Sequence, residues 1–558
     1  MSACGAGRSD GSAAAGLTRA GRRNARTNHY DRPVASVASR ARALPSVGPL
    51  STGLLVPAAV LFVLFAASLY LRTKSLGESL WMDEGLSIGI ASQPLFDIPG
   101  VLRVDGSPPL YYMLLSVWID VFGDGPADTQ SLSMVIALLT IPGGMWAGWS
   151  LFGRRAGLIC AALCAVNPFL TNYAQETRMY SLMLLLSLLT AAAFLHVFAF
   201  RRRSYLPAFV IFLALLVYTH NWGLFMAAGS LVGLVPCWYV SADRRAFVRD
   251  ALIGFGCVGV LYLPWVPTLL HQIQHTGAPW LNAPNFGAPV QISKGLLGGG
   301  TPTVALLLAG GSGIAVILQR RVDDRERSAV IAGLLVPLAT LAVAWIVSQV
   351  SPAWTTRYLG VILGPLLLVS AVGLARAGKL GLVALVIVLG IWAIPRTFGL
   401  TNKSNAADLR VASVPELRKG DLVLSMQPEQ GPLLEYHLER LGGAPKLTFA
   451  NAMGLVKNDR VMDWTDGYDR MKDATTAKNL EPLLARLPAG GRVLIVHPVT
   501  TRVDDWDSPW TELVRRRSAQ WGGALASDER FTRVAVVPPF YRRATRIGVR
   551  GVIYEKSG

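Results

Sequence analysis

Residues 52 to 71 read TGLLVPAAVLFVLFAASLYL, a stretch with no charged side chain. As a helix, this stretch is long enough to cross about 30 Å of hydrocarbon. It is too long for the apolar core of a signal peptide, and no small-x-small cleavage site follows it closely, so we expect it to remain in the protein. Similar runs recur up to residue 395, and 52% of the 558 residues are hydrophobic. The sequence therefore predicts an α-helical polytopic membrane protein.

The net charge of +18 has one clear source in residues 1 to 50. This segment is rich in Gly, Ala and Ser and has no apolar period, and its arginines are Arg8, Arg19, Arg22, Arg23, Arg26, Arg32, Arg40 and Arg42. Such a composition is typical of a disordered basic cytoplasmic tail that holds orientation at an anionic membrane. No set of stacking aromatic residues accompanies the arginines, so we do not expect nucleic acid as a partner.

The five cysteines indicate neither a disulfide framework nor a metal quartet. Four of them, Cys160, Cys164, Cys237 and Cys257, lie inside apolar runs, and Cys4 lies in the basic tail. Small apolar packing is the expected use of the four in the runs.

Orientation follows from the loops that carry arginine or lysine, because short basic loops stay in the cytoplasm. These loops carry Arg154 and Arg155, Arg201 to Arg203, Arg244 with Arg245 and Arg249, Arg320 with Arg321, Arg325 and Arg327, and Arg376 with Lys379. Alternation between them predicts eleven spans and places the carboxyl end outside the plasma membrane. The spans are residues 52 to 71, 130 to 152, 156 to 172, 181 to 200, 205 to 219, 222 to 240, 250 to 269, 301 to 319, 329 to 349, 359 to 375 and 380 to 395.

One apolar stretch, PPLYYMLLSVWIDVF at residues 108 to 122, is not needed as a span. It is short, opens with two prolines and carries Asp120, and as a span it would invert every later loop. We interpret it as a juxtamembrane or re-entrant helix. It lies in a long outer loop, residues 72 to 129, with a second amphipathic piece near residues 84 to 103. The predicted membrane domain as a whole is residues 51 to 395.

Residues 396 to 558 have the composition of a soluble domain. Short β-type segments, such as 421 to 425, 446 to 450, 493 to 496 and 534 to 537, alternate with helix-like stretches at 431 to 441 and 479 to 487. This alternation predicts an extracytoplasmic α/β domain.

Charged residues are scarce on the predicted outer face, so the few segments that carry them are informative. WMDE, at residues 81 to 84, follows the first span, and its two acids also suit the first turn of a helix. DGSPPLYY, at residues 105 to 112, has tyrosines that suit either stacking on a sugar or a simple helix entry.

Two further segments bring arginine to the same face. YAQETRMY, at residues 173 to 180, contains Glu176 and Arg178, which also suit a lone surface ion pair. WTTRY, at residues 354 to 358, contains Arg357. An isolated arginine at this position also suits simple extension of its side chain to the lipid headgroups.

Histidines and one tryptophan are weaker candidates. His220 ends the fifth span, and His271 with His275 follows the seventh; these suit either a structural role or binding of acceptor or a divalent cation. Trp280 suits either sugar stacking or an interface anchor.

In this order and among many spans, WMDE, DGSPPLYY, YAQETRMY and TTRYL resemble the motifs of the GT-C glycosyltransferases. The nearest group is the dolichyl-phosphate-mannose mannosyltransferase-like family, which includes aminoarabinose transferases and protein O-mannosyltransferases. The resemblance covers residues 52 to about 395. The family usually has His before the paired prolines, where Ser107 stands here, so no histidine role is carried over.

The resemblance implies that Asp83 is the catalytic carboxylate, with Glu84 in a supporting role. The chemistry agrees, because transfer from a sugar monophosphate lipid needs a base for the acceptor hydroxyl and cations for the departing phosphate. Arg178 and Arg357 are expected to hold that phosphate, with Arg103 as a third candidate. The expected substrate-binding residues are Asp105, Ser107, Tyr111, Tyr112, Tyr173, Glu176, Tyr180, His220, Trp280 and Tyr358. No metal ligand is assigned and no cofactor is required, while a divalent cation stays open.

The predicted function is transfer of a sugar from a polyprenyl-phosphate donor to a cell-envelope glycan or lipoglycan on the extracytoplasmic face, with inversion at the anomeric carbon. Mannose is the sugar that the resemblance favours, and arabinofuranose or another pentose is the alternative. A secondary transporter would instead place charges near the bilayer midplane. A binding or assembly protein would not need the acidic pair and both arginines.

The domain at residues 396 to 558 is expected to recognise the acceptor and to contribute nothing to the displacement step. Its candidate sugar platforms are Trp464, Tyr468, Trp506 and Trp510.

Overall fold

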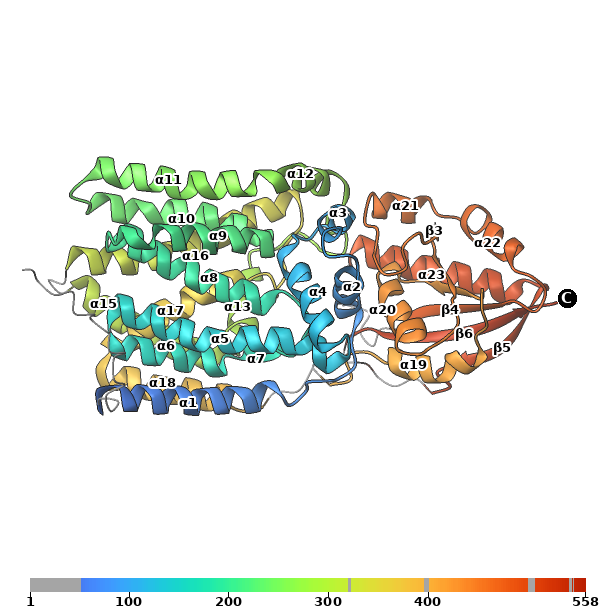
Figure 1. Cartoon of the computed structure of the whole chain (residues 1–558), viewed down its shortest axis with the longest axis horizontal. Coiled ribbons are helices and arrows are strands. Elements are labelled where there is room, and N and C mark those ends of the chain that lie inside the picture. The colour runs from blue at the N-terminus through green and yellow to red at the C-terminus, as the bar shows by residue number, and fades with distance from the viewer. Residues whose placement is uncertain (1–51, 320–322, 396–400, 500–506, 541–543, 545) are drawn as a thin grey trace, which may run out of the picture. The chain divides into compact units, whose positions relative to one another are not determined.

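The computed structural model describes residues 52–319, 323–395, 401–499, 507–540, 544 and 546–558. The predicted basic tail and Trp506 therefore lie outside the described residues. The first part of the chain is a bundle of helices, and the last part contains a β-sheet (Figure 1).

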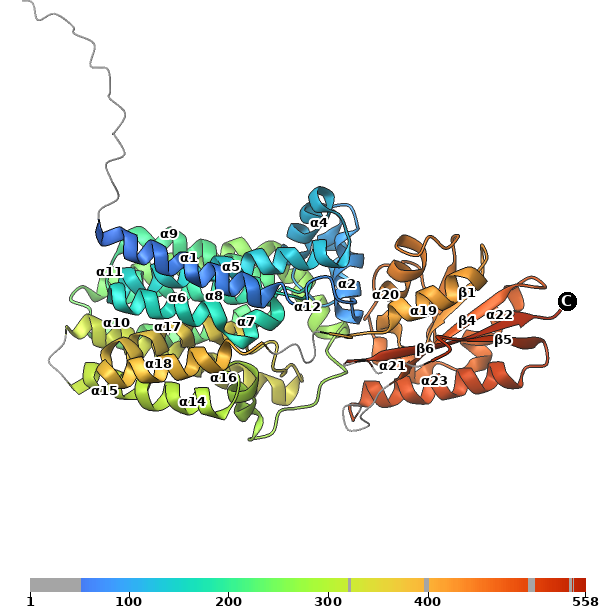
Figure 2. The same ribbon diagram turned by 90° about the horizontal axis from the view of Figure 1, so that it is seen from below.

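Helices that lie side by side form the bundle (Figures 1 and 2). They are α1 (Thr52–Arg72), α5 (Pro126–Phe152), α6 (Arg154–Val166), α7 (Pro168–Tyr173), α8 (Tyr180–Phe194), α9 (Leu206–Thr219), α10 (Trp222–Tyr239), α11 (Arg244–Tyr262), α12 (Val266–His275), α13 (Gln291–Gly295), α14 (Gly300–Ala305), α15 (Gly311–Gln319), α16 (Asp324–Val350), α17 (Gly360–Arg376) and α18 (Gly378–Trp392).

Each of the eleven expected spans coincides with helix. Within the described residues, seven helices are long and apolar enough to cross a membrane: Leu55–Arg72, Pro126–Phe152, Tyr180–Ala199, Trp222–Tyr239, Arg244–His275, Gly300–Gln319 and Asp324–Val350. Three more expected spans are shorter apolar helices, namely Arg203–Thr219, Gly360–Arg376 and Gly378–Trp392. The span expected at residues 156 to 172 is divided into α6 and α7 at Asn167, whose side chain accepts a hydrogen bond from Leu170 N at 3.2 Å. The prediction of a polytopic helical membrane protein is confirmed.

Glycines let neighbouring helices approach closely. A Cβ atom at Gly229 of α10 would lie 2.6 Å from the carbonyl oxygen of Val336 on α16. A Cβ atom at Gly313 of α15 would collide with the backbone of Gly373 on α17. The hydrophobic effect does not hold helices together in lipid, so close van der Waals packing at such glycines stabilises the bundle.

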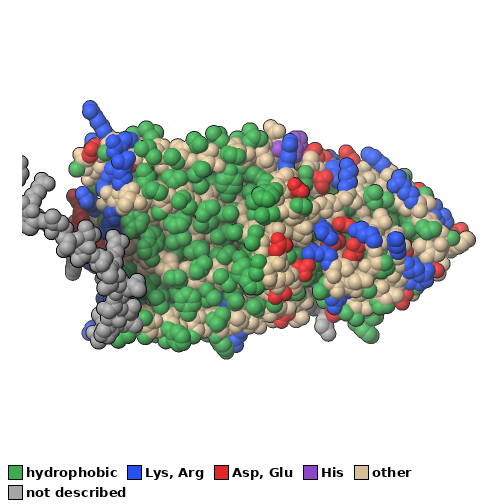
Figure 3. Space-filling view, in the orientation of Figure 1, with side chains coloured by type: hydrophobic (Ala, Val, Ile, Leu, Met, Phe, Trp, Pro, Cys, Tyr) green, Lys and Arg blue, Asp and Glu red, His purple; other side chains and the backbone are tan. Residues whose placement is uncertain are grey.

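The two ends of the bundle differ in charge. Basic loops meet at one end, where Arg202 donates to Ser150 O at 2.7 Å and Arg155 donates to Gly378 O at 3.2 Å. Figure 3 shows this end edged with Lys and Arg, beside a broad hydrophobic surface over the helices. The four motif segments meet at the opposite end, as alternation of the spans requires. Which end faces the cytoplasm remains a prediction.

Three short helices cover the motif end: α2 (Met82–Ala91), α3 (Ile98–Val101) and α4 (Leu110–Phe122). The end of α1 and the start of α5 are neighbours, because Gly77 N donates to Gln130 Oε1 at 2.8 Å. Helix α4 packs on the first turns of α5, where Trp118 Nε1 donates to Asp128 O at 2.9 Å. It lies beside α2 (Figure 2) and does not run along the bundle, which is the arrangement expected for a juxtamembrane helix.

The last part of the chain is built on one mixed sheet of six strands in the order β3-β2-β1-β4-β6-β5. The strands are β1 (Leu422–Ser425), β2 (Thr448–Asn451), β3 (Gly454–Leu455), β4 (Arg492–Val499), β5 (Phe531–Val537) and β6 (Gly548–Lys556). Strands β2, β1 and β4 are parallel, and β3, β6 and β5 are antiparallel to their neighbours. The four expected strands fall in β1, β2, β4 and β5, whereas β3 and β6 were not predicted.

Helices cover both faces of this sheet. Leu424 and Ile495 pack with α23 (Pro509–Ser527) on one face, together with α21 (Gly467–Asp473) and α22 (Glu481–Arg486). Val423 and Leu494 point to the other face, which α19 (Ala406–Ser413) and α20 (Gly431–Glu435) cover. Successive strand residues thus alternate between two cores, and the predicted α/β domain is confirmed as a fold.

Candidate active site

Helix α2 begins at the acidic pair, so Asp83 and Glu84 both lie in its first turn. Trp81 N donates to Glu84 Oε2 at 3.3 Å, which means that Glu84 does cap the helix. Both carboxylates are buried. They face different partners, and this difference separates their roles.

Asp83 lies among three guanidinium groups. Arg357 pairs with Asp83 Oδ2, and Arg178 Nη2 lies 3.9 Å from the same oxygen. Arg546 is the third positive charge acting on it. Burial alone would raise the pKa of the Asp83 carboxyl, but the three arginines outweigh burial and hold that pKa below its ordinary value. Asp83 is therefore ionised at neutral pH.

Aromatic rings support all three guanidinium groups, and Arg357 lies 5.7 Å from the ring centre of Tyr358. The Arg546 guanidinium lies 3.9 Å from the ring centre of Trp81, and that of Arg178 lies 5.7 Å from the ring centre of Tyr180. A ring face attracts a cation, so these contacts fix the positions of the charges around Asp83. Tyr180 stands in the same motif as Arg178, whereas Trp81 supports an arginine from the last part of the chain.

A group of packed rings lies behind the arginines. Ring centres are 4.7 Å apart for Tyr173 and Tyr180, 6.4 Å apart for Tyr180 and Tyr358, and 4.6 Å apart for His220 and Tyr358. Burial and the charges of Arg178 and Arg357 lower the pKa of His220 to about 3, so its ring is neutral. Its Nδ1 accepts a hydrogen bond from Trp222 N at 3.1 Å.

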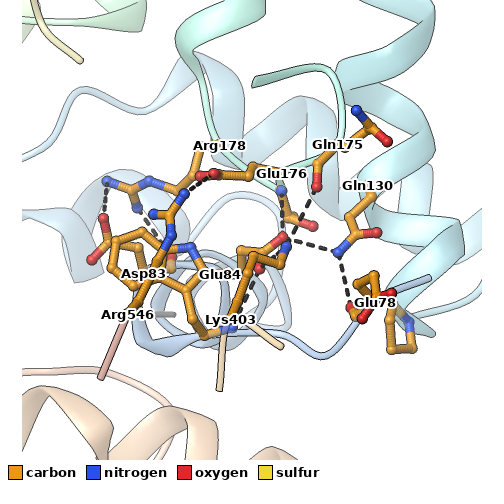
Figure 4. Close-up of polar contacts among 12 residues, drawn as sticks. Glu78, Asp83, Glu84, Gln130, Gln175, Glu176, Arg178, Lys403 and Arg546 are labelled. Atoms are coloured by element: carbon orange, nitrogen blue, oxygen red, sulfur yellow. Dashed lines mark hydrogen bonds and ion pairs between the residues drawn. The ribbon is translucent and has the colours of Figure 1, made fainter. Parts of the chain in front are cut away.

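Glu84 belongs to a separate, fully buried ion pair. Lys403 Nζ donates to Glu84 Oε2 at 2.7 Å, and both side chains are 0% exposed. Gln130 Nε2 and Thr177 N donate to Glu84 Oε1 at 3.1 and 3.0 Å. Figure 4 shows Lys403 and Gln130 beside the carboxylate. Glu84 therefore ties α2 to α5, to the third motif and to the residues after the last span.

Glu176 pairs with Arg546 and not with Arg178 (Figure 4). The lone surface pair considered from the sequence is therefore wrong, because Glu176 is fully buried. Burial raises the pKa of Glu176, and the charges of Arg546 and Lys403 oppose that rise. Residues of the last part of the chain thus neutralise both buried glutamates next to Asp83.

Asp105 is a second carboxylate close to Asp83. Burial raises the pKa of Asp105, while Ser107 donates a hydrogen bond to it and the charge of Arg178 opposes the rise. Tyr112 is 1% exposed, and Tyr111 is fully buried with its hydroxyl 3.0 Å from Ser133 Oγ. Neither tyrosine presents a ring face to a surface ligand, so the expected stacking role of this pair is wrong.

Several other expected residues lie elsewhere. Arg103 is exposed, and no described ion pair includes it. The ring of Trp280 lies 4.5 Å from that of Trp464, which in turn lies 5.1 Å from that of Trp510. Trp464 and Trp510 are buried in the core of the sheet domain, so neither is a sugar platform. Tyr468 is the exposed member of the described candidates.

No metal centre is evident in the part of the chain that the structure describes. No group of three His, Cys, Asp or Glu side chains there is arranged to hold a metal ion. The rings of His271 and His275 are 4.6 Å apart, and His275 Nδ1 lies 3.0 Å from Asp466 Oδ1. The contact between His275 and Asp466 therefore joins the bundle to the sheet domain.

A cavity of about 300 Å³ lies at the motif end of α1, α7 and α18. Its lining includes Leu71, Lys74, Phe169, Tyr173, Lys294, Thr356, Trp392 and Ile394. Apolar side chains from the ends of the helices thus meet two lysines. Tyr173 and Thr356 connect this cavity to the aromatic group and to Arg357.

Lys403 and Arg546 were not predicted as site residues. Lys403 follows the last apolar run and is a cation on the predicted outer face, a signal of the same kind as Arg357. Arg546 carries no comparable signal. Residues after 395 thus contact the glutamates beside Asp83, which was not expected, and a chain ending near Leu400 would lack both cations.

No protein-family model matches the sequence, and no curated protein matches it. Solved structures match the fold. ArnT from Cupriavidus metallidurans in the apo state aligns with a TM-score of 0.56 and 14% identity, covering 89% of this chain and 98% of that one. ArnT bound to undecaprenyl phosphate aligns with a TM-score of 0.55 and 15% identity, covering 90% and 98%.

The archaeal oligosaccharyltransferase AglB from Archaeoglobus fulgidus, in complex with an inhibitory peptide and a dolichol-phosphate, aligns with a TM-score of 0.48 and 14% identity, covering 80% of this chain and 70% of that one. The likeness to ArnT shows that the chain has the GT-C fold. The fold that the four motifs predicted is therefore confirmed.

Proposed function

We propose that this membrane protein is a glycosyltransferase that moves a sugar from a polyprenyl-phosphate donor to a cell-envelope glycan or lipoglycan. The reaction takes place on the extracytoplasmic face of the plasma membrane and inverts the anomeric carbon. Mannose is the donor sugar that the motif resemblance favours. The observation that carries the proposal is an ionised carboxylate, Asp83, held between Arg178, Arg357 and Arg546 at one end of a GT-C bundle.

Unpartnered donors support a phosphate at this place. Arg178 Nε, Arg357 Nε and Trp81 Nε1 are buried and have no hydrogen-bond partner among the described residues. Buried donors are seldom left without an acceptor. A phosphate group supplies several acceptor oxygens, and guanidinium groups suit it in charge and in shape.

The same arginines connect donor binding to the strength of the base. In the structure they lower the pKa of Asp83, which makes it a weak base. A bound phosphate shares their charge, so the pKa of Asp83 rises when the donor is present. Asp83 then takes the proton of the acceptor hydroxyl, the hydroxyl oxygen bonds to the anomeric carbon, and the bond from that carbon to the phosphate oxygen breaks. The arginines hold the negative charge of the departing lipid phosphate.

The cavity beside α1, α7 and α18 suits the lipid part of the donor. Leu71, Phe169 and Trp392 supply apolar surface next to the hydrophobic exterior of the bundle, while Lys74 and Lys294 supply positive charge. A polyprenyl phosphate has the same combination of apolar chain and anionic head. ArnT, which shares the fold, has been solved with undecaprenyl phosphate bound.

The function is tested with sealed vesicles that contain the purified protein in one known orientation. Polyprenyl phosphates labelled in mannose, arabinofuranose or aminoarabinose are supplied on one face at a time with a glycan acceptor. We expect mannose to move only when the donor and acceptor are on the face that carries Asp83. Movement of arabinofuranose alone would replace the donor sugar, and movement of none would reject the proposal.

Replacing Arg357 by Gln is expected to lower the transfer rate about 10²- to 10³-fold, because one donor to the charge of the transition state is lost. Arg357 is the charge that lowers the pKa of Asp83 most, so its removal raises that pKa. The acid limb of the pH profile should therefore move to higher pH. Arg103→Gln is the matched control, as Arg103 is exposed on the same face of the bundle. Equal losses in both variants, or an acid limb that stays in place, would contradict the assignment.

A further inference from the structure

A second cavity, of about 500 Å³, opens at the carboxyl ends of two parallel strands. Ser425, the last residue of β1, and Asn451, the last residue of β2, line it. Open sheets with parallel strands bind ligands outside the carboxyl ends of the strands, at the point where the strand order reverses, and in this sheet the order reverses at β1. The volume lies in the range of cavities that hold a small organic ligand.

The opposite wall of this cavity comes from the outer loop that carries the acidic pair. Gly100 and Val101 of α3 and the neighbouring Val104 line it. Trp464 N donates to Val104 O at 2.9 Å, so the sheet domain and the outer loop are joined at the rim. A ligand in the cavity therefore contacts both.

The charges around the cavity balance. Lys457, Asp459, Asp463 and Arg470 are its charged lining residues, two of each sign. Both acids are already paired, Asp463 with Arg470 at 2.9 Å and Asp459 with Lys446 at 2.9 Å. The four charged lining residues thus sum to zero, and the described residues that line the cavity include no cluster of guanidinium groups like that around Asp83.

The uncharged lining suits a sugar. Asn451 and Asn458 carry amide groups, which both donate and accept hydrogen bonds, and Phe449, Met453 and Met462 supply apolar surface. A neutral sugar ring has the matching surfaces, with hydroxyl groups at its edge and C–H groups on its faces. A site that is specific for a small ligand usually has an apolar wall with a small number of polar groups that point to the ligand.

The cavity lies next to the helix of the catalytic carboxylate. Gly89 of α2 packs directly on the backbone of Arg460, and a Cβ atom there would collide with it. Arg460 belongs to the segment 456 to 463, most of which lines the cavity. Asp83 precedes Gly89 by six residues, which is about 9 Å along a helix. The cavity and Asp83 thus lie near opposite ends of the same buried helix.

We propose that this cavity binds the acceptor as a neutral oligosaccharide, at sugar residues internal to the one that receives the new sugar. The proposal rests on the glycosyltransferase function proposed above and gives it an acceptor subsite. It also gives the sheet domain a recognition role that depends on β1, β2 and α3, and not on the buried tryptophans.

Gly100→Trp tests the site by filling it. Gly100 is exposed and lines the cavity, and an added Cβ atom meets nothing within 4 Å, so the fold should tolerate the change. Gly523→Trp is the matched control, because Gly523 is also a helical residue with nothing within 4 Å, and it does not line the cavity. Both variants are prepared as full chains in nanodiscs.

Binding is measured by saturation-transfer NMR with α-1,6-linked mannotetraose and α-1,5-linked arabinotetraose, which are neutral, and with tetragalacturonate, which is anionic. We expect the wild type and Gly523→Trp to bind at least one neutral tetramer, Gly100→Trp to bind neither, and no variant to prefer tetragalacturonate. Unchanged binding by Gly100→Trp, or a preference for the anionic tetramer, would overturn the proposal.

A second measurement compares transfer to a tetrasaccharide acceptor with transfer to an alkyl monosaccharide. Gly100→Trp should lower this ratio about tenfold by removing binding energy remote from the reacting group, while Gly523→Trp leaves it unchanged. An unchanged ratio in Gly100→Trp contradicts the subsite. The binding measurement needs no turnover, so a protein that binds a neutral tetramer but transfers no sugar would refute the proposed function and leave the sugar site standing.

Discussion

Replacing Asp83 by Asn is expected to lower the rate of sugar transfer about 10²- to 10⁴-fold, because the change removes the base but keeps the size of the side chain. Asp83 is buried among three arginines. An exposed carboxylate elsewhere on the protein therefore cannot act as the base in the variant. The rate is measured with saturating labelled donor in nanodiscs, and the amount of protein in the membrane is measured in parallel.

Asp97→Asn is the control for this experiment, since Asp97 is an exposed acid of the same outer loop. It should transfer sugar at the rate of the wild type. A rate within a fewfold of the wild type in Asp83→Asn would remove Asp83 from the chemistry. The reaction would then need another base, and Asp105 would be the nearest candidate.

Replacing Lys403 by Met is expected to destabilise the protein by about 3 to 5 kcal/mol, because the carboxylate of Glu84 stays buried without a counter-ion. The effect should appear as a lower midpoint of thermal unfolding in detergent and as lost transfer activity. Lys419→Met removes a lysine of the same region that is exposed, and it should leave both quantities unchanged.

A double variant separates the ion pair from general damage at this position. Glu84→Gln combined with Lys403→Met removes both charges and keeps an acceptor oxygen for Thr177 N. We expect its unfolding midpoint to lie well above that of Lys403→Met alone. A double variant that is no more stable than the single one would show that Lys403 acts through packing and not through its charge.

Local patterns account for most of the correct predictions of the fold. Apolar runs and basic loops are short-range signals, and the segments at β4 and β5 are rich in β-branched residues. Strand β6 (Gly548–Lys556) was missed because it begins at a glycine and Gly551 interrupts it. Helix α23 (Pro509–Ser527) was missed for a related reason, since Gly522 and Gly523 lower helix propensity in its second half.

Site residues were predictable from the sequence only where they belong to one of the four motifs. Asp83, Arg178 and Arg357 meet as the ordered motifs suggested. Lys403 and Arg546 contact glutamates that are 319 and 370 residues away in the chain, and no periodicity or spacing marks such a pair. Tyr111 was misassigned because a tyrosine at the start of a helix gives no sign of which face it occupies.

The contacts of Arg546 also determine when, during synthesis of the chain, the proposed site becomes complete. A chain is made from its amino end, and domains fold in that order. When the last membrane helix has been inserted, Asp83, Arg178 and Arg357 are all present, but Glu84 and Glu176 still lack Lys403 and Arg546 as partners. The site is complete only after the segment just before β6 has been synthesised and folded. An unfinished chain in the membrane would therefore not release sugar from the donor pool.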